Sequence, residues 1–391
     1  LTMKNLNNKS YTLLFSSIGH ALMHMFAAFY FVIILTIEKE WNISYDQLIR
    51  LWTLGALLIG LGAIPFGWLS DRWSRSGTMT IMFIGMGLAS ILCGLSTSIS
   101  LLFISLSLLG LFCSIYHPVG IPWVIHSANK QGRALGINGI FGGVGIGSGA
   151  FVAGTLTELL NWQLAFILPG FISIIIGFIL IYFIFINKIS YKNVFINNIE
   201  KDHSRNEVIL ISLIMLISMF ALGLTFHNTQ TALPKVFEIR IDNINSIQIG
   251  LMIGIIYFIS GATTFVGGLL ADRFNLKTIY LIGIFLQFPC YLGIAYVSGY
   301  SLVVLCILAA VFNASILPTE NLLLSKFTPQ KYHGVVYGIK FILAFGSGPI
   351  SVFLISEIYS ITLEFTYLFL INAIMMGLVS IFIIFLPIQI N

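Results

Sequence analysis

The sequence predicts an all-α membrane protein with twelve transmembrane helices in two pseudo-symmetric six-helix bundles. Hydrophobic residues make up 58% and charged residues 8% of the 391 residues, whereas about a quarter of the residues in a soluble domain are charged. Apolar runs of about 20 residues, the length that crosses a bilayer as a helix, can be placed twelve times. Landmarks of the first half also return in the second half, which indicates two copies of one unit.

In chain order, the predicted spans cover residues 11–36, 47–68, 78–97, 101–125, 133–156, 163–186, 207–233, 247–270, 278–297, 301–325, 334–356 and 364–386. The connections between them are too short for a soluble catalytic or binding domain. The sequence also contains no nucleophile–base constellation and no ATP-binding motif. We therefore expect a protein that is not an enzyme and that needs no cofactor.

The longest polar segment divides the chain into an N-terminal bundle (1–186), a linker (187–206) and a C-terminal bundle (207–391). An even number of spans places both termini on one side, together with most of the basic residues. The other side has only Lys39, Arg50, Lys235 and Arg240. By the positive-inside rule the termini and the linker are cytoplasmic, as expected in a bacterial inner membrane. The excess of basic residues is thus a topology signal and does not indicate nucleic-acid binding.

A short charged turn follows the second span of each half. The first copy runs from Gly67 to Arg75 and the second from Gly268 to Lys277, and Pro118 likewise recurs as Pro318. The aspartate of the turn can interact with the positive end of a neighbouring helix. The arginines of the turn can bind carboxylates or lipid phosphates. One interpretation is a gating latch, and the other is a topology determinant in contact with lipid. The candidate gating residues are Gly67, Asp71, Arg72, Arg75, Gly268, Asp272 and Arg273.

Six helices, a polar linker, six more helices and a Gly-x-Leu-small-Asp-Arg turn in each half resemble the major facilitator superfamily over the whole chain. Ser74 replaces the usual glycine in the first turn, and the second turn departs further from the pattern. Tyr116-His117-Pro118 in the fourth span, followed by a glycine-rich fifth span, is similar to the fosmidomycin-resistance type of exporter. His20 in the first span also fits this type, whereas Val119 replaces its acidic residue.

Glu320 and Lys340 are ionisable residues inside apolar spans. The tenth and eleventh spans are antiparallel across a short loop, so the two charges are expected at similar depth. An ionised side chain near the bilayer centre costs roughly 2.5–3.5 kcal/mol, comparable with the ~3.7 kcal/mol needed to neutralise a glutamate at pH 7. Pairing lets both residues stay charged. The pair is either a switch that a proton or an anionic substrate breaks, or a permanent structural contact.

The first half has uncharged polar residues at positions that match those of the charged pair in the second half. Asn138 is the repeat partner of Lys340, and His117 precedes Pro118, which is expected to kink the helix. An imidazole can carry a proton near neutral pH, but His117 can equally be a structural, hydrogen-bonded residue.

Further polar residues lie on the spans that, by the resemblance, line a central cavity. His20 and His24 lie one turn apart on one face of the first span, and His227 has a similar place in the seventh. These imidazoles form a substrate or proton site, a divalent-metal site, or isolated contacts with backbone. Imidazole with carboxylate suits Zn, Fe or Ni, but the sequence contains no compact metal motif, so we predict no metal ligands. The candidate substrate- and proton-binding residues are His20, His24, Tyr116, His117, Asn138, His227, Asn228, Asn313, Glu320 and Lys340.

The glycine-rich run from Phe141 to Gly149 lies within an apolar span and lacks the strand–turn–helix context of a phosphate loop. Small residues at this density allow close helix packing.

The sequence therefore predicts a monomeric secondary active transporter, working by alternating access in contact with membrane lipid. We expect proton-coupled export of a small polar or amphipathic solute, with Glu320 and His117 as proton carriers. Import of a small organic anion, with Lys340 as counter-charge, is the alternative, followed by divalent-metal transport and by a membrane sensor on a transporter scaffold.

Overall fold

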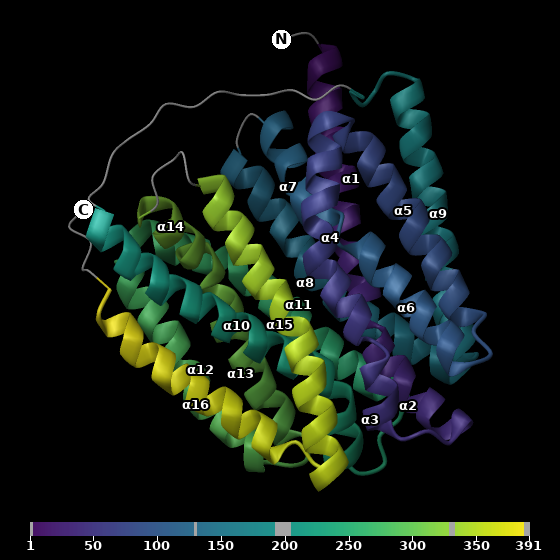
Figure 1. Ribbon diagram of the computed structural model, residues 1–391, viewed down its shortest axis with the longest axis vertical. Coiled ribbons are helices and arrows are strands. Elements are labelled where there is room, and N and C mark those ends of the chain that lie inside the picture. The colour runs from purple at the N-terminus through teal and green to yellow at the C-terminus, as the bar shows by residue number, and fades with distance from the viewer. Residues whose placement is uncertain (1–2, 129–130, 192–204, 328–332, 387–391) are drawn as a thin grey trace. The chain divides into compact units, whose positions relative to one another are not determined.

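The computed structural model describes residues 3–128, 131–191, 205–327 and 333–386 (Figure 1), and every regular element in these ranges is an α-helix. The chain divides into two compact units. The first comprises Leu1–Ile196 with Asn245–Gly254, and the second Asn197–Ile244 with Ile255–Asn391. Most of the predicted linker, residues 192–204, lies outside the described residues.

The first nine helices belong to the first unit. They are α1 (Met3–Ala28), α2 (Tyr30–Trp41), α3 (Tyr45–Arg50), α4 (Thr53–Arg72), α5 (Arg75–Gly94), α6 (Ile99–Cys113), α7 (Tyr116–Ser127), α8 (Gln131–Leu159) and α9 (Trp162–Phe185).

The remaining seven helices form the second unit, except that the start of α11 groups with the first. They are α10 (Arg205–Arg240), α11 (Ser246–Arg273), α12 (Leu276–Tyr296), α13 (Ser301–Ser315), α14 (Leu317–Phe327), α15 (His333–Thr362) and α16 (Thr366–Ile384).

Twelve helical segments within the described residues are long and apolar enough to cross a bilayer, which confirms the predicted number of spans. Several are longer than predicted, because charged residues at the ends continue the helix beyond the apolar run. The first, for example, reaches Trp41 rather than residue 36. Four of the spans consist of two helices in succession, namely α1 with α2, α3 with α4, α6 with α7, and α13 with α14.

Two of these interruptions have the same cause. Proline has no N–H group, and its ring collides with the carbonyl of the residue four positions earlier. Pro118 therefore disturbs the helix at Ser114, where α6 gives way to α7. Pro318 does the same between α13 and α14. The helix is therefore interrupted beside Pro118, where a kink is expected, and an equivalent interruption occurs in the second unit.

The two units pack their helices in the same pairs. In the first unit α1 packs along α8, and α5 along α9; in the second unit α10 packs along α15, and α12 along α16 (Figure 1). In both cases the first span of the unit pairs with the fifth and the third with the sixth. The internal repeat seen in the sequence is thus a repeat of packing as well.

Close packing of α1 on α8 depends on glycine. A Cβ atom on Gly145 would lie 2.3 Å from the carbonyl oxygen of Ala21, and one on Gly149 would lie 2.9 Å from that of Met25. These contacts are backbone to backbone, so no side-chain rotation can relieve them. The glycine-rich run therefore serves helix packing, as the sequence indicates.

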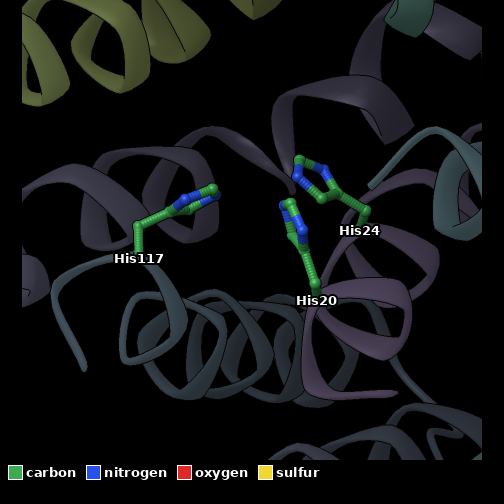
Figure 2. A group of neighbouring side chains, drawn as sticks. All are labelled: His20, His24 and His117. Atoms are coloured by element: carbon green, nitrogen blue, oxygen red, sulfur yellow. The ribbon is translucent and has the colours of Figure 1, made fainter. Parts of the chain in front are cut away.

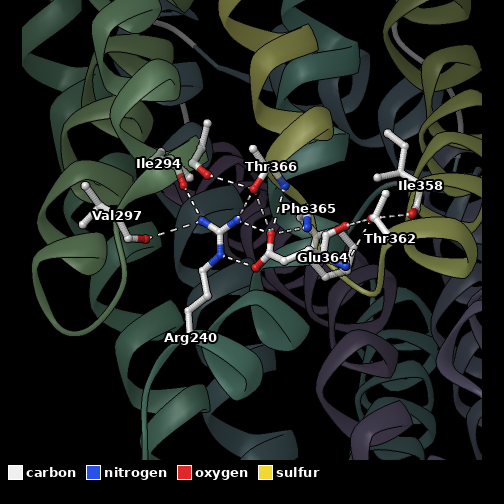
Figure 3. A network of polar contacts seen from close by, with 9 residues as sticks. Arg240, Ile294, Val297, Ile358, Thr362, Glu364, Phe365 and Thr366 are labelled. Carbon is white, nitrogen blue, oxygen red and sulfur yellow. Dashed lines mark hydrogen bonds and ion pairs between the residues drawn. The ribbon is translucent and has the colours of Figure 1, made fainter.

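A polar network holds together one end of the second unit (Figure 3). Arg240, at the end of α10, forms an ion pair with Glu364 and donates hydrogen bonds to the carbonyl of Ile294 on α12 and to the hydroxyl of Thr366. Glu364 also accepts a hydrogen bond from the backbone amide of Phe365. The network therefore joins α10, α12 and the turn between α15 and α16.

Glu364 lies outside the spans, between Thr362 and Thr366. Partial burial by itself raises the pKa of its carboxyl group. The hydrogen bonds from Arg240 and from the amides of Phe365 and Thr366 together outweigh burial, and the pKa lies below its ordinary value of 4.5.

Replacing Gly145 by alanine is expected to destabilise the first unit. Because the added methyl group meets a backbone oxygen, we expect a loss of roughly 1–3 kcal/mol, as for other overpacked cores, seen as a lower midpoint of thermal unfolding in detergent. Gly139→Ala on the same helix is the matched control, since a Cβ there meets no atom within 4 Å. An equal loss in both variants would contradict the backbone-contact explanation.

The Glu364 carboxylate is expected to make stability depend on pH. Because its pKa is lowered by folding, the stabilisation is fully present above about pH 4.5 and is lost as the pH falls through the folded-state value. Thermal unfolding midpoints measured from pH 6 downward should decline for the wild type and less steeply for Glu364→Gln. Asp242→Asn, which removes an exposed carboxylate near the same end of α10, should keep the wild-type slope; an unchanged slope in Glu364→Gln would refute the assignment.

Candidate functional site

Three imidazoles gather inside the first unit (Figure 2). His20 and His24 come from α1 and His117 from α7, and their rings point into one common space. The ring centroids of His20 and His24 lie 4.9 Å apart, and His117 lies 5.5 Å from each. One ring nitrogen from each residue can be chosen so that all three lie within 4.8 Å of one another. We call these three residues the imidazole cluster.

The orientation of His20 is fixed by its neighbours. Its Nδ1 lies 2.8 Å from the backbone carbonyl of Asn138, so Nδ1 donates and Nε2 is left as the acceptor nitrogen. The ring of Tyr116 stacks against it at 4.6 Å. A Cβ on Gly142 would lie 3.0 Å from the Nε2 atom of His20, so the glycine on α8 leaves the space that the imidazoles occupy.

Next to the imidazole cluster, Tyr116, Asn138 and Ser16 form a polar network. The Tyr116 hydroxyl donates to Asn138 Oδ1 at 2.9 Å, and Asn138 Nδ2 donates to the Ser16 hydroxyl at 3.3 Å. Ser16 in turn donates to the carbonyl of Gly120 at 3.1 Å. All three side chains are buried. Sequence reasoning missed Ser16, whose hydroxyl carries no pattern that marks it.

The second unit contains a buried ion pair. The Lys340 ammonium on α15 lies 2.5 Å from the Glu320 carboxylate on α14, and the two side chains are only 12% and 3% exposed. The structure therefore brings together the two intramembrane charges that the sequence singles out. Lys340 also donates to Asn321 Oδ1 at 2.6 Å.

The other oxygen of Glu320 accepts a hydrogen bond from Tyr280 on α12 at 3.2 Å, and the Tyr280 hydroxyl lies 2.9 Å from that of Ser218 on α10. Four helices thus contribute to one chain of polar contacts. Tyr280, Ser218 and Asn321 were not predicted, because a lone tyrosine, serine or asparagine near an apolar run has no periodic signal.

Pro318 helps to place the Glu320 carboxylate. By interrupting the span, it makes α14 begin at Leu317, so that Glu320 falls in the first turn of a helix. The N-terminal end of a helix dipole stabilises negative charge by about 0.3–1 kcal/mol. The equivalent residue of the first unit is Gly120, two positions after Pro118. The two units therefore share the interruption but not the carboxylate.

The other predicted residues of the second unit take separate partners. His227 Nε2 lies 3.2 Å from the carbonyl of Ala344 on α15. Asn228 donates to Asn372 on α16 at 2.8 Å, and Asn313 donates to Gln287 on α12 at 3.3 Å. Their hydrogen bonds thus tie them to three different helices and not to the Glu320–Lys340 pair.

The first charged turn has a compact structure. Asp71 and Arg75 form an ion pair at 3.0 Å, and the Arg72 guanidinium lies 4.7 Å from the ring centre of Trp68. Ser74 caps α5 by accepting from the amide of Gly77, and its hydroxyl donates to the carbonyl of Tyr191, which fastens the start of the predicted linker to the first unit.

The glycines of the two turns differ. A Cβ on Gly67 would lie 3.2 Å from Pro118, whereas one on Gly268 would meet no atom within 4 Å. In the second unit the close approach is made one residue earlier, where a Cβ on Gly267 would lie 1.9 Å from the carbonyl of Ser315. Asp272 and Arg273 are exposed.

Comparison with known proteins agrees with this architecture. Two solved structures of a bacterial homolog of the human lysosomal transporter Spinster, one inward-facing and unoccupied and one inward-facing and occupied, superpose with TM-scores of 0.71 and 0.70. Each covers 97% of this chain and 94–95% of the other at 15% sequence identity, which establishes the shared fold.

Two curated proteins are similar in sequence over part of their length. The riboflavin transporter RibZ of Clostridioides difficile is 27% identical over 147 residues, covering 36% of this chain and 32% of that protein. An uncharacterized transporter of Buchnera aphidicola is 23% identical over 240 residues, covering 59% and 56%. The matched regions thus span about a third and just over half of these relatives.

The family model of the Major Facilitator Superfamily matches residues 16–339 and 208–389, which together take in nearly the whole described chain. Members of this family are membrane transporters, and twelve helices within the described residues are long and apolar enough to cross a bilayer. The protein is therefore an integral, multi-pass membrane transporter, not an enzyme, and it belongs to the Major Facilitator Superfamily.

Proposed function

We propose that this transporter exports a small polar or amphipathic solute in exchange for protons, by alternating access. The observation that supports the proposal best is the buried Glu320–Lys340 ion pair. An intramembrane ionisable residue is costly, and it is usually retained because it takes part in transport. In this proposal a proton gradient, and not ATP, supplies the energy.

The pair has the properties of a proton-operated switch. Removing one partner of a buried ion pair costs about 3–5 kcal/mol, because the other charge is left uncompensated. Protonation of the Glu320 carboxylate has the same effect on Lys340, so one proton can change which arrangement of the second unit is stable. A change in the pair would also affect Tyr280, which bonds Glu320, and Asn321, which bonds Lys340.

Export is supported by the local resemblance of Tyr116-His117-Pro118 to the fosmidomycin-resistance type of exporter. His117 faces the other two imidazoles, and we assign it a secondary role as proton carrier. The first charged turn acts as a gating latch in this proposal, through the Asp71–Arg75 ion pair.

The proposed setting is a bacterial inner membrane with both termini in the cytoplasm. The distribution of Lys and Arg supports this orientation. Large apolar side chains are exposed along the spans, which suits a monomer surrounded by lipid.

The proposal predicts that Glu320→Gln uncouples solute movement from proton movement. Proteoliposomes that contain a pH-sensitive dye are given riboflavin or fosmidomycin as probes, chosen for the relatives named above. Exchange of entering solute for leaving protons should raise the lumenal pH with wild-type protein. In Glu320→Gln this change should be lost, while exchange of labelled for unlabelled solute continues because it needs no net proton transfer.

Glu238→Gln is the matched control. Glu238 forms an ion pair with Lys235 at 2.8 Å within a single helix, so the variant removes a carboxylate without touching the Glu320–Lys340 pair. It should retain the solute-dependent pH change. A full pH change in Glu320→Gln, or its loss in both variants, would refute the role of Glu320.

Import of a small organic anion is the second candidate, and the position of Lys340 favours it. The Lys340 side chain is more exposed than that of Glu320, and its ammonium contacts two oxygen-bearing side chains, which an anion could displace. Symport of an anion with protons would lower the lumenal pH in the same assay. In that case Lys340→Met should abolish uptake altogether, including exchange.

A further inference from the structure

From the imidazole cluster we infer that His20, His24 and His117 form a binding site for a divalent transition-metal ion of the zinc class. The sequence predicts no metal ligands, because the three residues are far apart in the chain. The fold brings them together: two come from successive turns of α1, and the third from the first turn of α7, just after the interruption at Ser114. This inference does not depend on the proposed transport cycle.

The geometry is close to that of a metal site without a metal. In a tetrahedral zinc site with Zn–N distances of about 2.0–2.1 Å, ligand nitrogens lie about 3.4 Å apart. The three candidate nitrogens already lie within 4.8 Å of one another, so modest rotations of the imidazoles close the site. His20 and His24, four residues apart on one helical face, have a spacing that commonly provides two zinc ligands.

The surroundings orient a ligand in the way metal sites require. A metal-bound imidazole usually donates its second ring N–H to a carbonyl or carboxylate, which fixes the tautomer. His20 does so through Nδ1 to the Asn138 carbonyl, and this leaves Nε2 as the nitrogen that can bind a metal. Gly142 leaves room at that nitrogen. The orientation therefore exists before any ion binds.

The ligand set also limits which ion can bind. Three neutral imidazoles suit Zn²⁺, Co²⁺, Ni²⁺ or Cu²⁺, whereas Mg²⁺ and Ca²⁺ require oxygen ligands. Three protein ligands leave at least one position for water or for a donor atom of a solute, as in zinc sites that remain open. Since the cluster itself contributes no negative charge, we expect reversible binding.

Metal binding by the purified, tag-free protein in detergent tests this inference. Titration calorimetry with Zn²⁺ should show one ion bound per chain, and Mg²⁺ should give no signal. Co²⁺ should produce the intense visible absorption of a four-coordinate site. Loss of a partner in the outer shell of a metal site lowers affinity about 10–100-fold, so His24→Gln and His117→Gln should each lower Zn²⁺ affinity by at least about tenfold.

The control is His126→Gln on the same helix as His117. The Nδ1 atom of His126 is 2.7 Å from the carbonyl of Pro122, and His126 lies outside the cluster. It should bind Zn²⁺ with wild-type affinity. His24→Gln and His117→Gln are preferred to a His20 variant because His20 also bonds Asn138 and stacks on Tyr116; a monodisperse elution profile establishes that they fold. Absence of Zn²⁺ binding by the wild type, or unchanged affinity in both cluster variants, would overturn the inference.

Discussion

The structure depends on one constraint: a polar group inside a membrane-spanning helix has no water to bind, so it must find its partner within the protein. Serines meet this constraint locally, as Ser105 and Ser107 do by donating to carbonyls one turn earlier. Several larger groups take a partner on another helix instead, as Asn228 does with Asn372. The Glu320–Lys340 pair is a demanding case, because two charges are largely removed from water, and Tyr280 and Asn321 each bond one member of it.

The same constraint explains why so much of the fold could be predicted from the sequence. The length of each apolar run predicts a span. The charged turn and the proline, which both occur in each half of the chain, indicate two similar units. The interruptions after Ala28 and before Thr53 could not be predicted, since no proline follows either of them within a few residues. The sequence marks Arg240 only as a topology residue, and nothing in it links Arg240 to Glu364, which lies 124 positions away.

The candidate site likewise includes contacts that the sequence could predict and contacts that it could not. Glu320 and Lys340 could be paired in advance because antiparallel helices joined by a short loop bring equal depths together. His20 and His24 could be placed on one face by their spacing. That His117 joins them depends on how α7 is rotated after the interruption at Pro118, and rotation about a helix axis leaves no trace in a uniformly apolar sequence. The partners of Asn228 were unpredictable for the same reason.

The proline interruption recurs in both units, but the residue two positions after the proline differs: Gly120 offers only a backbone carbonyl where Glu320 offers a carboxylate. The duplicated scaffold has thus been given different chemistry in each half, imidazoles in one and a charge pair in the other. In the two proposals, the divalent ion binds in the first unit, whereas proton coupling involves Glu320 in the second unit and His117 in the first. Because an imidazole binds a metal only in its deprotonated form, a bound ion and a proton would compete for His117, and the two proposals meet at this side chain.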